Sequence, residues 1–261
     1  MSEHREINRQ IWEDWTNEGF TPAFDFVDRF KNGAEHLRSF ELEEVGDVKD
    51  KTLLHLQCHF GLDTLAWAKH GAKATGTDFS ETAISKARAL ADEVDVPADF
   101  VVSDVYDIPK NVEGQFDIVY TSFGVLAWLP DLDEWGRIIA ERLKPGGFFY
   151  IAEYHPILYV FDDSETATEP RIRHPYFPRD EPVKYTDPQG RDVYGWRFSL
   201  SGVVNALAKA GLDLEFLHEF PFTESQQLPY LEFSKDGWWR LPPKFGGEIP
   251  LTFSIKAHKP A

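Results

Sequence analysis

Short apolar runs alternate with segments of helical periodicity from about residue 50 onward. Such runs are typical of buried strands, and apolar positions three and four residues apart are typical of helices packed on a sheet. We expect strands at 52–57, 72–78, 99–104, 116–123, 148–156, 214–220 and 250–259, and helices at 63–71, 80–94, 131–143 and 199–212. This alternation predicts an α/β fold with a doubly wound, mostly parallel sheet of seven strands.

Two segments depart from this pattern. Residues 1–45 mix aromatic and charged side chains, which predicts an N-terminal helical cap on a main domain formed by residues 46–261. Residues 156–197 are rich in proline, charge and aromatic side chains, and the stretch DPQG at 187–190 is a strong turn signal. We therefore expect an irregular or hairpin insertion at 156–197, after the fifth strand.

The composition narrows the classes of partner. The 261 residues carry a formal net charge of -17, which repels the phosphates of nucleic acids and anionic lipids. The single cysteine, Cys58, excludes an internal disulfide, and no run of roughly 18 apolar residues is present to span a membrane. The N-terminus has no apolar signal region, so we expect a cytoplasmic protein without nucleic-acid or membrane partners.

The turn after the first predicted strand has an unusual composition. In open α/β sheets the ligand lies beyond the carboxyl ends of the strands and touches this turn, which reads QCHFGLD. Dinucleotide sites need G-x-G-x-x-G so that bare backbone can approach a pyrophosphate, and here Gly61 is the only glycine. Gln57, His59 and Phe60 fill positions where a pyrophosphate would lie, which argues against NAD and FAD.

Two aspartates follow the next strands in the order that a nucleoside site needs. Asp78 ends the second strand, roughly 20 residues after the turn, where a carboxylate can accept both ribose hydroxyls. Asp104 ends the third strand beside Val105, where it can accept a hydrogen bond from an adenine amino group. A turn with one glycine, one acid placed to bind the ribose and one acid placed to bind the adenine base together indicate a site for a nucleoside without phosphates. S-adenosylmethionine fits this description.

A metal or a nucleophile at the turn is a competing interpretation. His55, Cys58 and His59 are so close in sequence that they rarely converge on one ion, and a second cysteine is missing. We therefore expect no metal, and a structural role for the Cys58 thiol.

Further motifs follow in the order of a known family. GTDFS follows the second strand, SDVYDIP the third, FDIVYTSFGVLAWLPDLDEW surrounds the fourth, and LKPGGFFYIAE precedes the fifth. In these motifs, residues 50–155 resemble a class I S-adenosylmethionine-dependent methyltransferase of the small-molecule type. The family's first turn commonly reads D-L-G-C-G-x-G. Here His55 replaces the acid, Gln57 and His59 replace the first two glycines, and Cys58 and Gly61 are kept in the variant turn LQCHFGLDTL.

The resemblance implies a Rossmann-like methyltransferase fold and a set of contacts to the cofactor S-adenosylmethionine. The expected cofactor-binding residues lie in the turns after the first four strands: Gln57, Cys58, His59, Phe60, Gly61, Asp78, Phe79, Ser80, Asp104, Val105, Thr121, Ser122 and Phe123. In relatives the N-terminal helix folds over the cofactor. Aromatic residues of that helix and of the C-terminal loop are therefore candidates for a substrate pocket: Trp12, Trp15, Tyr230 and Trp238.

Methyl transfer from a sulfonium is an in-line displacement, and a general base is needed only when the acceptor must lose a proton. His155 ends the fifth strand, at the edge that faces the transferred methyl in this fold, and Glu153 and Tyr154 are its neighbours. We expect these three residues to supply any base or substrate-orienting group. The alternative is that His155 has a structural role and is hydrogen-bonded in the turn before Pro156.

Three functions follow from this site. The first is a methyltransferase that acts on a small-molecule acceptor, because the fourth strand ends in TSFG and lacks the motifs of DNA-modifying enzymes of this fold. The second is a protein that binds S-adenosylmethionine or its product S-adenosylhomocysteine (SAH) without turnover, as a sensor or partner subunit. The third is a nicotinamide-dependent oxidoreductase, against which the missing G-x-G-x-x-G counts.

Overall fold

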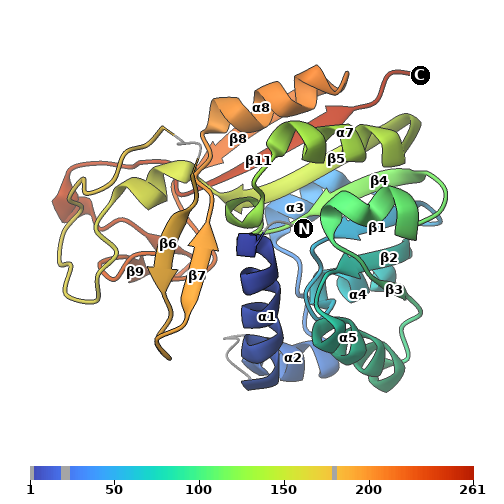
Figure 1. Cartoon of the computed structure of the whole chain (residues 1–261), viewed down its shortest axis with the longest axis horizontal. Coiled ribbons are helices and arrows are strands. Elements are labelled where there is room, and N and C mark those ends of the chain that lie inside the picture. Colours follow the sequence, from blue (N-terminus) through green and yellow to red (C-terminus); the bar gives the residue numbers. More distant parts are fainter. Residues whose placement is uncertain (1–2, 19–23, 178–180) are drawn as a thin grey trace.

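The computed structural model describes residues 3–18, 24–177 and 181–261 and is built around one seven-stranded sheet (Figure 1). The strand order is β3-β2-β1-β4-β5-β11-β8. In chain order the strands are β1 (Thr52–Leu56), β2 (Lys73–Asp78), β3 (Asp99–Val102), β4 (Phe116–Thr121), β5 (Leu143–Tyr154), β8 (Asp213–Phe220) and β11 (Thr252–His258). The predicted doubly wound, mostly parallel sheet is therefore confirmed.

The direction of the strands identifies the switch point. β1 pairs in parallel with both β2 and β4, and the parallel pairing continues to β3 on one side and β5 on the other. β11 is antiparallel to β5 and β8. The strand order reverses between β1 and β4, so the turns that follow these two strands diverge and leave room for a ligand.

The alternation of side chains along β1 explains how helices cover both faces of the sheet. Leu53 packs in one apolar cluster with residues of α4 and α5, whereas Leu54 and Leu56 pack in a second cluster with residues of α7 and α8. The helices of the sheet region are α3 (Ser39–Val45), α4 (Leu62–Lys69), α5 (Glu81–Val94), α6 (Ile108–Asn111), α7 (Leu132–Arg142) and α8 (Leu200–Lys209). All seven strands are thus anchored by two buried cores.

One boundary differs from the sequence-based expectation. β5 begins at Leu143, ahead of the Pro145-Gly146-Gly147 stretch that was expected to separate a helix from a strand starting at 148. Leu143 pairs with Phe116, and the register shifts before Phe148 pairs with Ile118. This irregularity takes up the proline and the glycines at the start of the strand.

The N-terminal helices α1 (Glu3–Glu18) and α2 (Phe24–Lys31) pack beside the sheet domain. The Glu13 carboxylate accepts hydrogen bonds from the backbone N–H groups of Glu81 and Thr82 (2.7 and 3.2 Å), and so holds α1 against the start of α5. The division of the chain into a cap and a domain at residue 45 stays a prediction.

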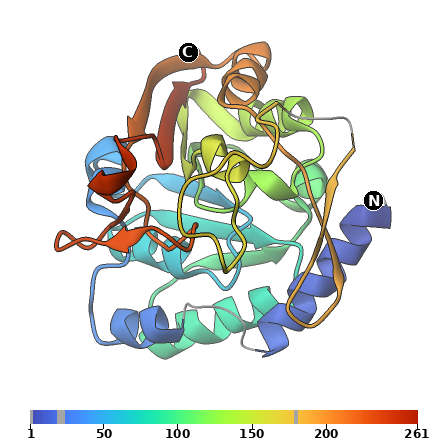
Figure 2. The ribbon, with the colours of Figure 1, turned by 90° about the vertical axis from the view of Figure 1, so that its left-hand side faces the viewer.

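The insertion after β5 contains a hairpin of β6 (Val183–Thr186) and β7 (Asp192–Gly195), which lies beside α1 (Figure 2). The Asp187 carboxylate stabilises its turn by accepting hydrogen bonds from the backbone of Gln189 and Arg191. Asn8 of α1 pairs with both backbone groups of Tyr194, at 2.6 and 2.9 Å. These two hydrogen bonds therefore hold α1 against strand β7 of the hairpin.

The remaining elements are short. A two-stranded ribbon joins β9 (Glu232–Phe233) and β10 (Trp239–Arg240), and 3₁₀ turns are η1 (Val105–Asp107), η2 (Leu126–Trp128), η3 (Pro156–Val160) and η4 (Pro243–Phe245). Within the described ranges, none of the helices has the length and apolar character needed to cross a bilayer.

Candidate functional site

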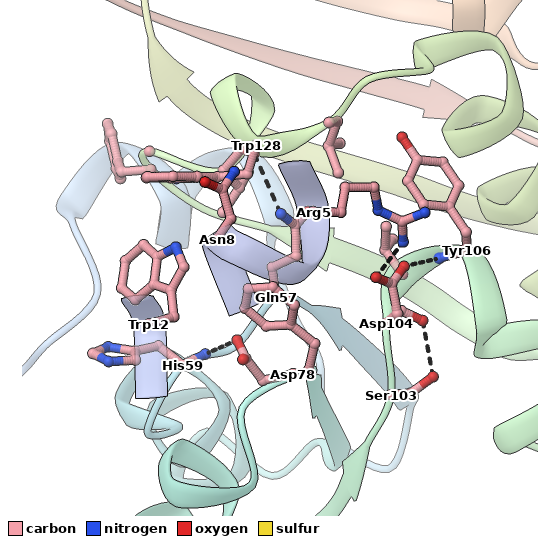
Figure 3. Close-up of a pocket in the computed structure, with 16 residues that line it drawn as sticks. Arg5, Asn8, Trp12, Gln57, His59, Asp78, Ser103, Asp104, Tyr106 and Trp128 are labelled. Atoms are coloured by element: carbon pink, nitrogen blue, oxygen red, sulfur yellow. Dashed lines mark hydrogen bonds and ion pairs between the residues drawn. The ribbon is translucent and has the colours of Figure 1, made fainter. Parts of the chain in front are cut away.

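A cavity with about 820 Å³ of empty space, part of it open to solvent, lies beyond the carboxyl ends of β1 to β4 (Figure 3). We call it the first cavity. α1 covers it with Arg5, Asn8 and Trp12. The rest of its lining comes from the turns after the four strands: Gln57, His59, Asp78, Phe79, Ser103, Asp104, Val105, Tyr106, Phe123, Gly124, Val125, Trp128 and Leu129.

The turn after β1 keeps a glycine-like backbone without the glycines. Gln57 and His59 have φ angles of 55° and 50°, and Gly61 has a φ of 83°. These left-handed conformations cost an ordinary residue about 1–2 kcal/mol each. Gln57 and His59 therefore occupy, under strain, the two positions at which the family carries its first two glycines. Strain of this kind is concentrated at functional sites.

Gly61 is retained for a reason that goes beyond its φ angle. It is the N-cap of α4, and a Cβ added there would lie 2.6 Å from Cε1 of Phe100. Phe100 belongs to β3 and is buried in the core beside the turn. A side chain at position 61 would have to displace that ring, whereas positions 57 and 59 carry their side chains into cavities.

Asp78 joins the end of β2 to the turn after β1. Its Oδ2 accepts a hydrogen bond from the backbone N–H of His59 and its Oδ1 from that of Ser80, both at 2.9 Å. Burial raises the pKa of Asp78 to about 6, although these two N–H donors oppose the shift. The carboxylate is therefore ionised at neutral pH, and it faces the first cavity.

Asp104 lies across the cavity from Asp78. It accepts a hydrogen bond from the backbone N–H of Tyr106 (2.9 Å), which caps η1, and forms an ion pair with Arg5 of α1. The Arg5 guanidinium also lies 4.5 Å from the centre of the Tyr106 ring (Figure 3). Asp104, which the sequence predicts to bind the adenine amino group, is thus held between η1 and α1.

A larger, second cavity adjoins the first, and Gln57, His59 and Phe123 line both. Its remaining lining comes from α2, the loop to α3, the turn after β1 and the segments around β5, β8 and β10: Phe26, Arg29, Phe30, Glu35, His36, Leu37, Arg38, His55, Cys58, Phe60, Gly61, Leu62, Asp63, Ser122, Tyr154, Glu224, Ser225, Gln226, Gln227, Gly237, Trp238 and Trp239. The turn after β1 therefore separates two connected spaces.

A polar network lies in the second cavity around Asp63. Asp63 Oδ2 accepts a hydrogen bond from Ser122 Oγ (2.6 Å), and Asp63 Oδ1 lies 3.2 Å from Arg38 Nη1. Arg38 also pairs with Glu224, which accepts a hydrogen bond from the Tyr154 hydroxyl (3.1 Å). Burial favours the neutral form of Asp63, but Arg38 outweighs it and holds the pKa of this carboxyl well below its usual range.

The cofactor-binding residues expected from the sequence divide between the two cavities. Those that line the first are Gln57, His59, Asp78, Phe79, Asp104, Val105 and Phe123. Those that line only the second are Cys58, Phe60, Gly61 and Ser122. Ser80 and Thr121 line neither, because the Ser80 hydroxyl caps α5 through the Ala83 N–H (3.0 Å) and the Thr121 hydroxyl donates to the Leu56 carbonyl (3.2 Å).

The two histidines and the cysteine near the turn have separate surroundings. His55 Nδ1 lies 2.8 Å from Thr64 Oγ1, and burial lowers the pKa of its ring to about 4. His59 packs edge-on against Trp12, and burial lowers its pKa to about 4 as well. Burial raises the pKa of the Cys58 thiol well above its usual value, so the thiol stays protonated.

The three catalytic candidates at the end of β5 have different places. Glu153 is fully buried, and its two oxygens accept hydrogen bonds from four backbone N–H groups, those of Gly124, Val125, Leu126 and Tyr154 (2.6–3.0 Å). The carboxylate thus stabilises the loop after β4 and has no free oxygen directed at a cavity. Tyr154 lines the second cavity.

His155 lies outside both cavities. Its Nδ1 accepts a hydrogen bond from the Ile157 N–H (3.1 Å) at the start of η3, and its Nε2 lies 3.0 Å from Glu219 Oε1. The ring therefore caps a 3₁₀ turn and faces β8, which is the hydrogen-bonded turn named above as the alternative, and a base or orienting role for His155 stays a prediction.

The four aromatic candidates for the substrate pocket are also separated. Trp12 lines the first cavity and Trp238 the second. Trp15 donates a hydrogen bond from Nε1 to Asp187 (3.1 Å) of the hairpin turn. Tyr230 is buried in a third apolar cluster and packs on Phe245, away from both cavities.

Sequence reasoning missed the polar and charged residues that the N-terminal segment contributes. Arg5 and Asn8 of α1 line the first cavity, and His36 and Arg38 of the loop before α3 line the second. They lie in segments without a strand-end signal. Among the residues of this polar network, Asp63 could have been identified from the sequence. It is an acid in the first turn of the helix that follows the predicted ligand-binding turn.

The chain is similar to known methyltransferases in sequence. Residues 54–149 match the family described as "Methyltransferase domain". A ubiquinone biosynthesis O-methyltransferase of Coxiella burnetii is 32% identical over 111 residues, which cover 42% of this chain and 47% of that protein. The enzyme of the same description from Bordetella avium is 31% identical over 121 residues, or 46% of this chain and 50% of that protein. The chain thus matches about half the length of these curated relatives.

Solved structures match over a larger part of the chain. A methyltransferase from Methanosarcina mazei, described as S-adenosylmethionine-dependent, has a TM-score of 0.58 at 17% identity and covers 86% of this chain and 98% of that chain. The structure of the DhpI–SAH complex has a TM-score of 0.60 at 14% identity and covers 100% of this chain and 99% of that chain. Together with the matched methyltransferase domain, this shows that the chain has the class I S-adenosylmethionine-dependent methyltransferase fold.

Proposed function

We propose that this protein is a methyltransferase that transfers the methyl group of S-adenosylmethionine to a small-molecule acceptor. The observation that carries the proposal is the pair Asp78 and Asp104, whose carboxylates open onto one cavity beyond the ends of β2 and β3. That cavity joins a second one at Gln57, His59 and Phe123, so a ligand in the first would present one end to the second.

The residues of the first cavity fit S-adenosylmethionine. Asp78 would accept the ribose hydroxyls and Asp104 the adenine amino group, between apolar walls that include Val105 and Leu129. Gln57 Oε1 is buried at the junction of the two cavities and has no hydrogen-bond partner among the described residues, so it can accept a bond from the cofactor's ammonium group. When bound, the cofactor supplies an activated methyl group on a sulfonium.

The protein's own contribution to such a reaction is positioning and exclusion of water. Well-oriented reactants reach effective molarities of roughly 10⁵ to 10⁸ M. α1 covers the first cavity through Arg5 and Trp12, and it is fixed to the hairpin by Asn8 and to α5 by Glu13. We infer that α1, fixed in this way, keeps the nucleoside end of the cofactor enclosed.

The net charge of the protein and the lining of the second cavity support a small-molecule acceptor. The net charge of -17 disfavours nucleic acids, and aromatic side chains such as Phe30, Phe123 and Trp238 line the second cavity. The curated relatives are named as O-methyltransferases of ubiquinone biosynthesis, which supports an oxygen acceptor here. We also propose a cytoplasmic location.

The strained turn supports one competing function. A protein that binds S-adenosylmethionine or SAH without turnover would also tolerate Gln57 and His59 at the glycine positions. The two functions are separated by measuring SAH formation from S-adenosylmethionine with a panel of small hydroxyl, amine and thiol compounds. Acceptor-dependent SAH formation supports the methyltransferase. Tight cofactor binding without SAH formation from any compound of the panel would favour the non-catalytic function.

A further inference from the structure

The second cavity contains a histidine paired with a carboxylate. His36 Nε2 lies 2.9 Å from Asp63 Oδ1, and the two side chains are only 13% and 12% exposed. His36 belongs to the loop between α2 and α3, and Asp63 belongs to the first turn of α4. Both residues line the second cavity, on the far side of the turn from the first cavity.

The partners of Asp63 determine which nitrogen of His36 carries the proton. Asp63 is fixed by the Ser122 hydroxyl (2.6 Å) and by Arg38 (3.2 Å), and Arg38 keeps it ionised against the effect of burial. An ionised carboxylate only accepts hydrogen bonds, so the neutral imidazole has its proton on Nε2. Nδ1 then carries the free lone pair, and no hydrogen bond among the described residues engages it.

Other charged and titratable groups of the second cavity and its polar network come from several elements: Arg29 from α2, Glu35 and Arg38 from the same loop as His36, Glu41 from α3, His55 from β1, Tyr154 from β5 and Glu224 after β8. Burial raises the pKa of Glu41, whereas Arg38 opposes this shift. Burial also keeps His55 neutral. The group in contact with His36 is therefore the ionised Asp63 carboxylate, whose Oδ1 also faces the Arg38 guanidinium.

Aromatic rings form the apolar part of the same space. The rings of Phe26 and Phe30 lie with their centres 6.0 and 6.2 Å from that of His36, in edge-on arrangements. Phe123 and Trp238 line the same cavity. A planar aromatic acceptor would be enclosed by such rings, with its polar group directed at the polar network.

We propose that His36 is the general base for a phenolic hydroxyl acceptor in the second cavity, and that Asp63 is its positioning residue. This inference rests on the proposed function. The acceptor oxygen forms the new O–CH₃ bond with its lone pair, and the S–CH₃ bond breaks with its electron pair left on sulfur. The hydroxyl proton moves to His36 Nδ1, and the imidazolium beside Asp63 later releases it to water.

The first test needs no activity. In the protein labelled with ¹⁵N-histidine, the His36 ring, assigned by its loss in His36→Gln, should show the tautomer with the proton on Nε2. Asp63→Asn should remove this preference, because an amide does not impose an acceptor on Nε2. A wild-type ring with its proton on Nδ1 would overturn the proposal, since that nitrogen could then accept nothing.

The second test compares two acceptors of different acidity, catechol and 4-nitrocatechol, at a pH where the second is already ionised. Loss of a general base should lower the kcat of His36→Gln with catechol by about 10² to 10⁴-fold, but the kcat with 4-nitrocatechol by less than about tenfold. His70→Gln is the matched control, because His70 also pairs with a carboxylate, Glu35 (2.8 Å), but lines neither cavity. It should leave both rates unchanged.

These tests distinguish a failure of the His36 proposal from a failure of the proposed function. An equal loss with both acceptors, or no loss with catechol, would remove His36 as the base. Methyl transfer only to amines or thiols would overturn the phenolic class and leave the proposed function intact. Absence of S-adenosylmethionine binding in the wild-type protein would overturn the proposed function itself.

Discussion

The backbone N–H of His59 donates a hydrogen bond to the Asp78 carboxylate over 2.9 Å, and so the end of β2 holds the turn that follows β1. His59 has a left-handed backbone conformation, which a histidine adopts at a cost. The bond to Asp78 offsets part of that cost. The residue proposed to bind ribose is therefore also the residue that shapes the turn beneath it.

Replacing Gln57 or His59 by glycine should relieve backbone strain without destroying the site. We expect the affinity for S-adenosylmethionine to stay within several-fold, because glycine adopts the φ angles of 55° and 50° readily. The lost contacts are the bond proposed from the cofactor's ammonium group to Gln57 Oε1, a hydrogen bond from Gln57 Nε2 to the Val125 carbonyl (3.2 Å) and the packing of His59 on Trp12. Calorimetric titration measures the affinity. Complete loss of binding would mean that these side chains supply most of the binding free energy, and not only the one bond proposed for Gln57 Oε1.

Gly61→Ala should destabilise the protein more than a left-handed φ alone explains. The new Cβ would lie 2.6 Å from the Phe100 ring, and overpacking of this kind costs about 1–3 kcal/mol beyond the backbone strain. Gly190→Ala is a matched control, since Gly190 has the same φ of 83° and nothing within 4 Å of the added Cβ. Urea denaturation gives both free energies of unfolding, and equal losses would contradict the packing argument.

Cofactor binding should depend on the ionisation of Asp78. Burial raises its pKa to about 6, and the ionised form accepts the ribose hydroxyls, so affinity should be constant above neutral pH and fall as the pH drops through 6. Titrations between about pH 5 and pH 8 measure this. Asp78→Asn should bind more weakly and lose the dependence near pH 6. The same fall in the variant would assign the effect to another group.

Glu153→Gln should lower stability and leave the reaction chemistry unchanged. Four backbone N–H groups point at the two carboxylate oxygens, and the amide nitrogen of glutamine would face two of them as a second donor. The expected loss is about 1–3 kcal/mol of unfolding free energy. Glu113→Gln, at an exposed surface position, should change it by less than about 0.5 kcal/mol. A stable Glu153→Gln protein that binds cofactor normally but has lost its turnover would restore Glu153 as a catalytic residue.

The sequence predicts the sheet well, and it also predicts that two strand-end acids lie close together, for a physical reason. Strands such as 116–121 are short, mostly apolar runs, and parallel strands bring their carboxyl ends to one edge of the sheet. Asp78 and Asp104 follow such strands directly, so their convergence on one cavity follows from topology alone.

The lining of the second cavity was not predictable in the same way. His36 and Arg38 lie in a loop without periodicity, and they meet Asp63 and Glu224 through contacts that span up to 186 positions of sequence. His155 was placed at the cavity because it ends β5, but its ring caps η3 instead. Loop conformation decides both cases, and hydrophobic pattern does not encode it.

The measurement that tests the central claim most directly is calorimetric titration of the purified protein with S-adenosylmethionine, SAH and NADH, in parallel with Asp78→Asn and Asp99→Ala. Asp99 lies exposed at the opposite end of β3 and serves as the control. We predict micromolar binding of the first two ligands, weakened in Asp78→Asn, unchanged in Asp99→Ala, and no binding of NADH. A folded wild-type protein that binds neither S-adenosylmethionine nor SAH would contradict the account.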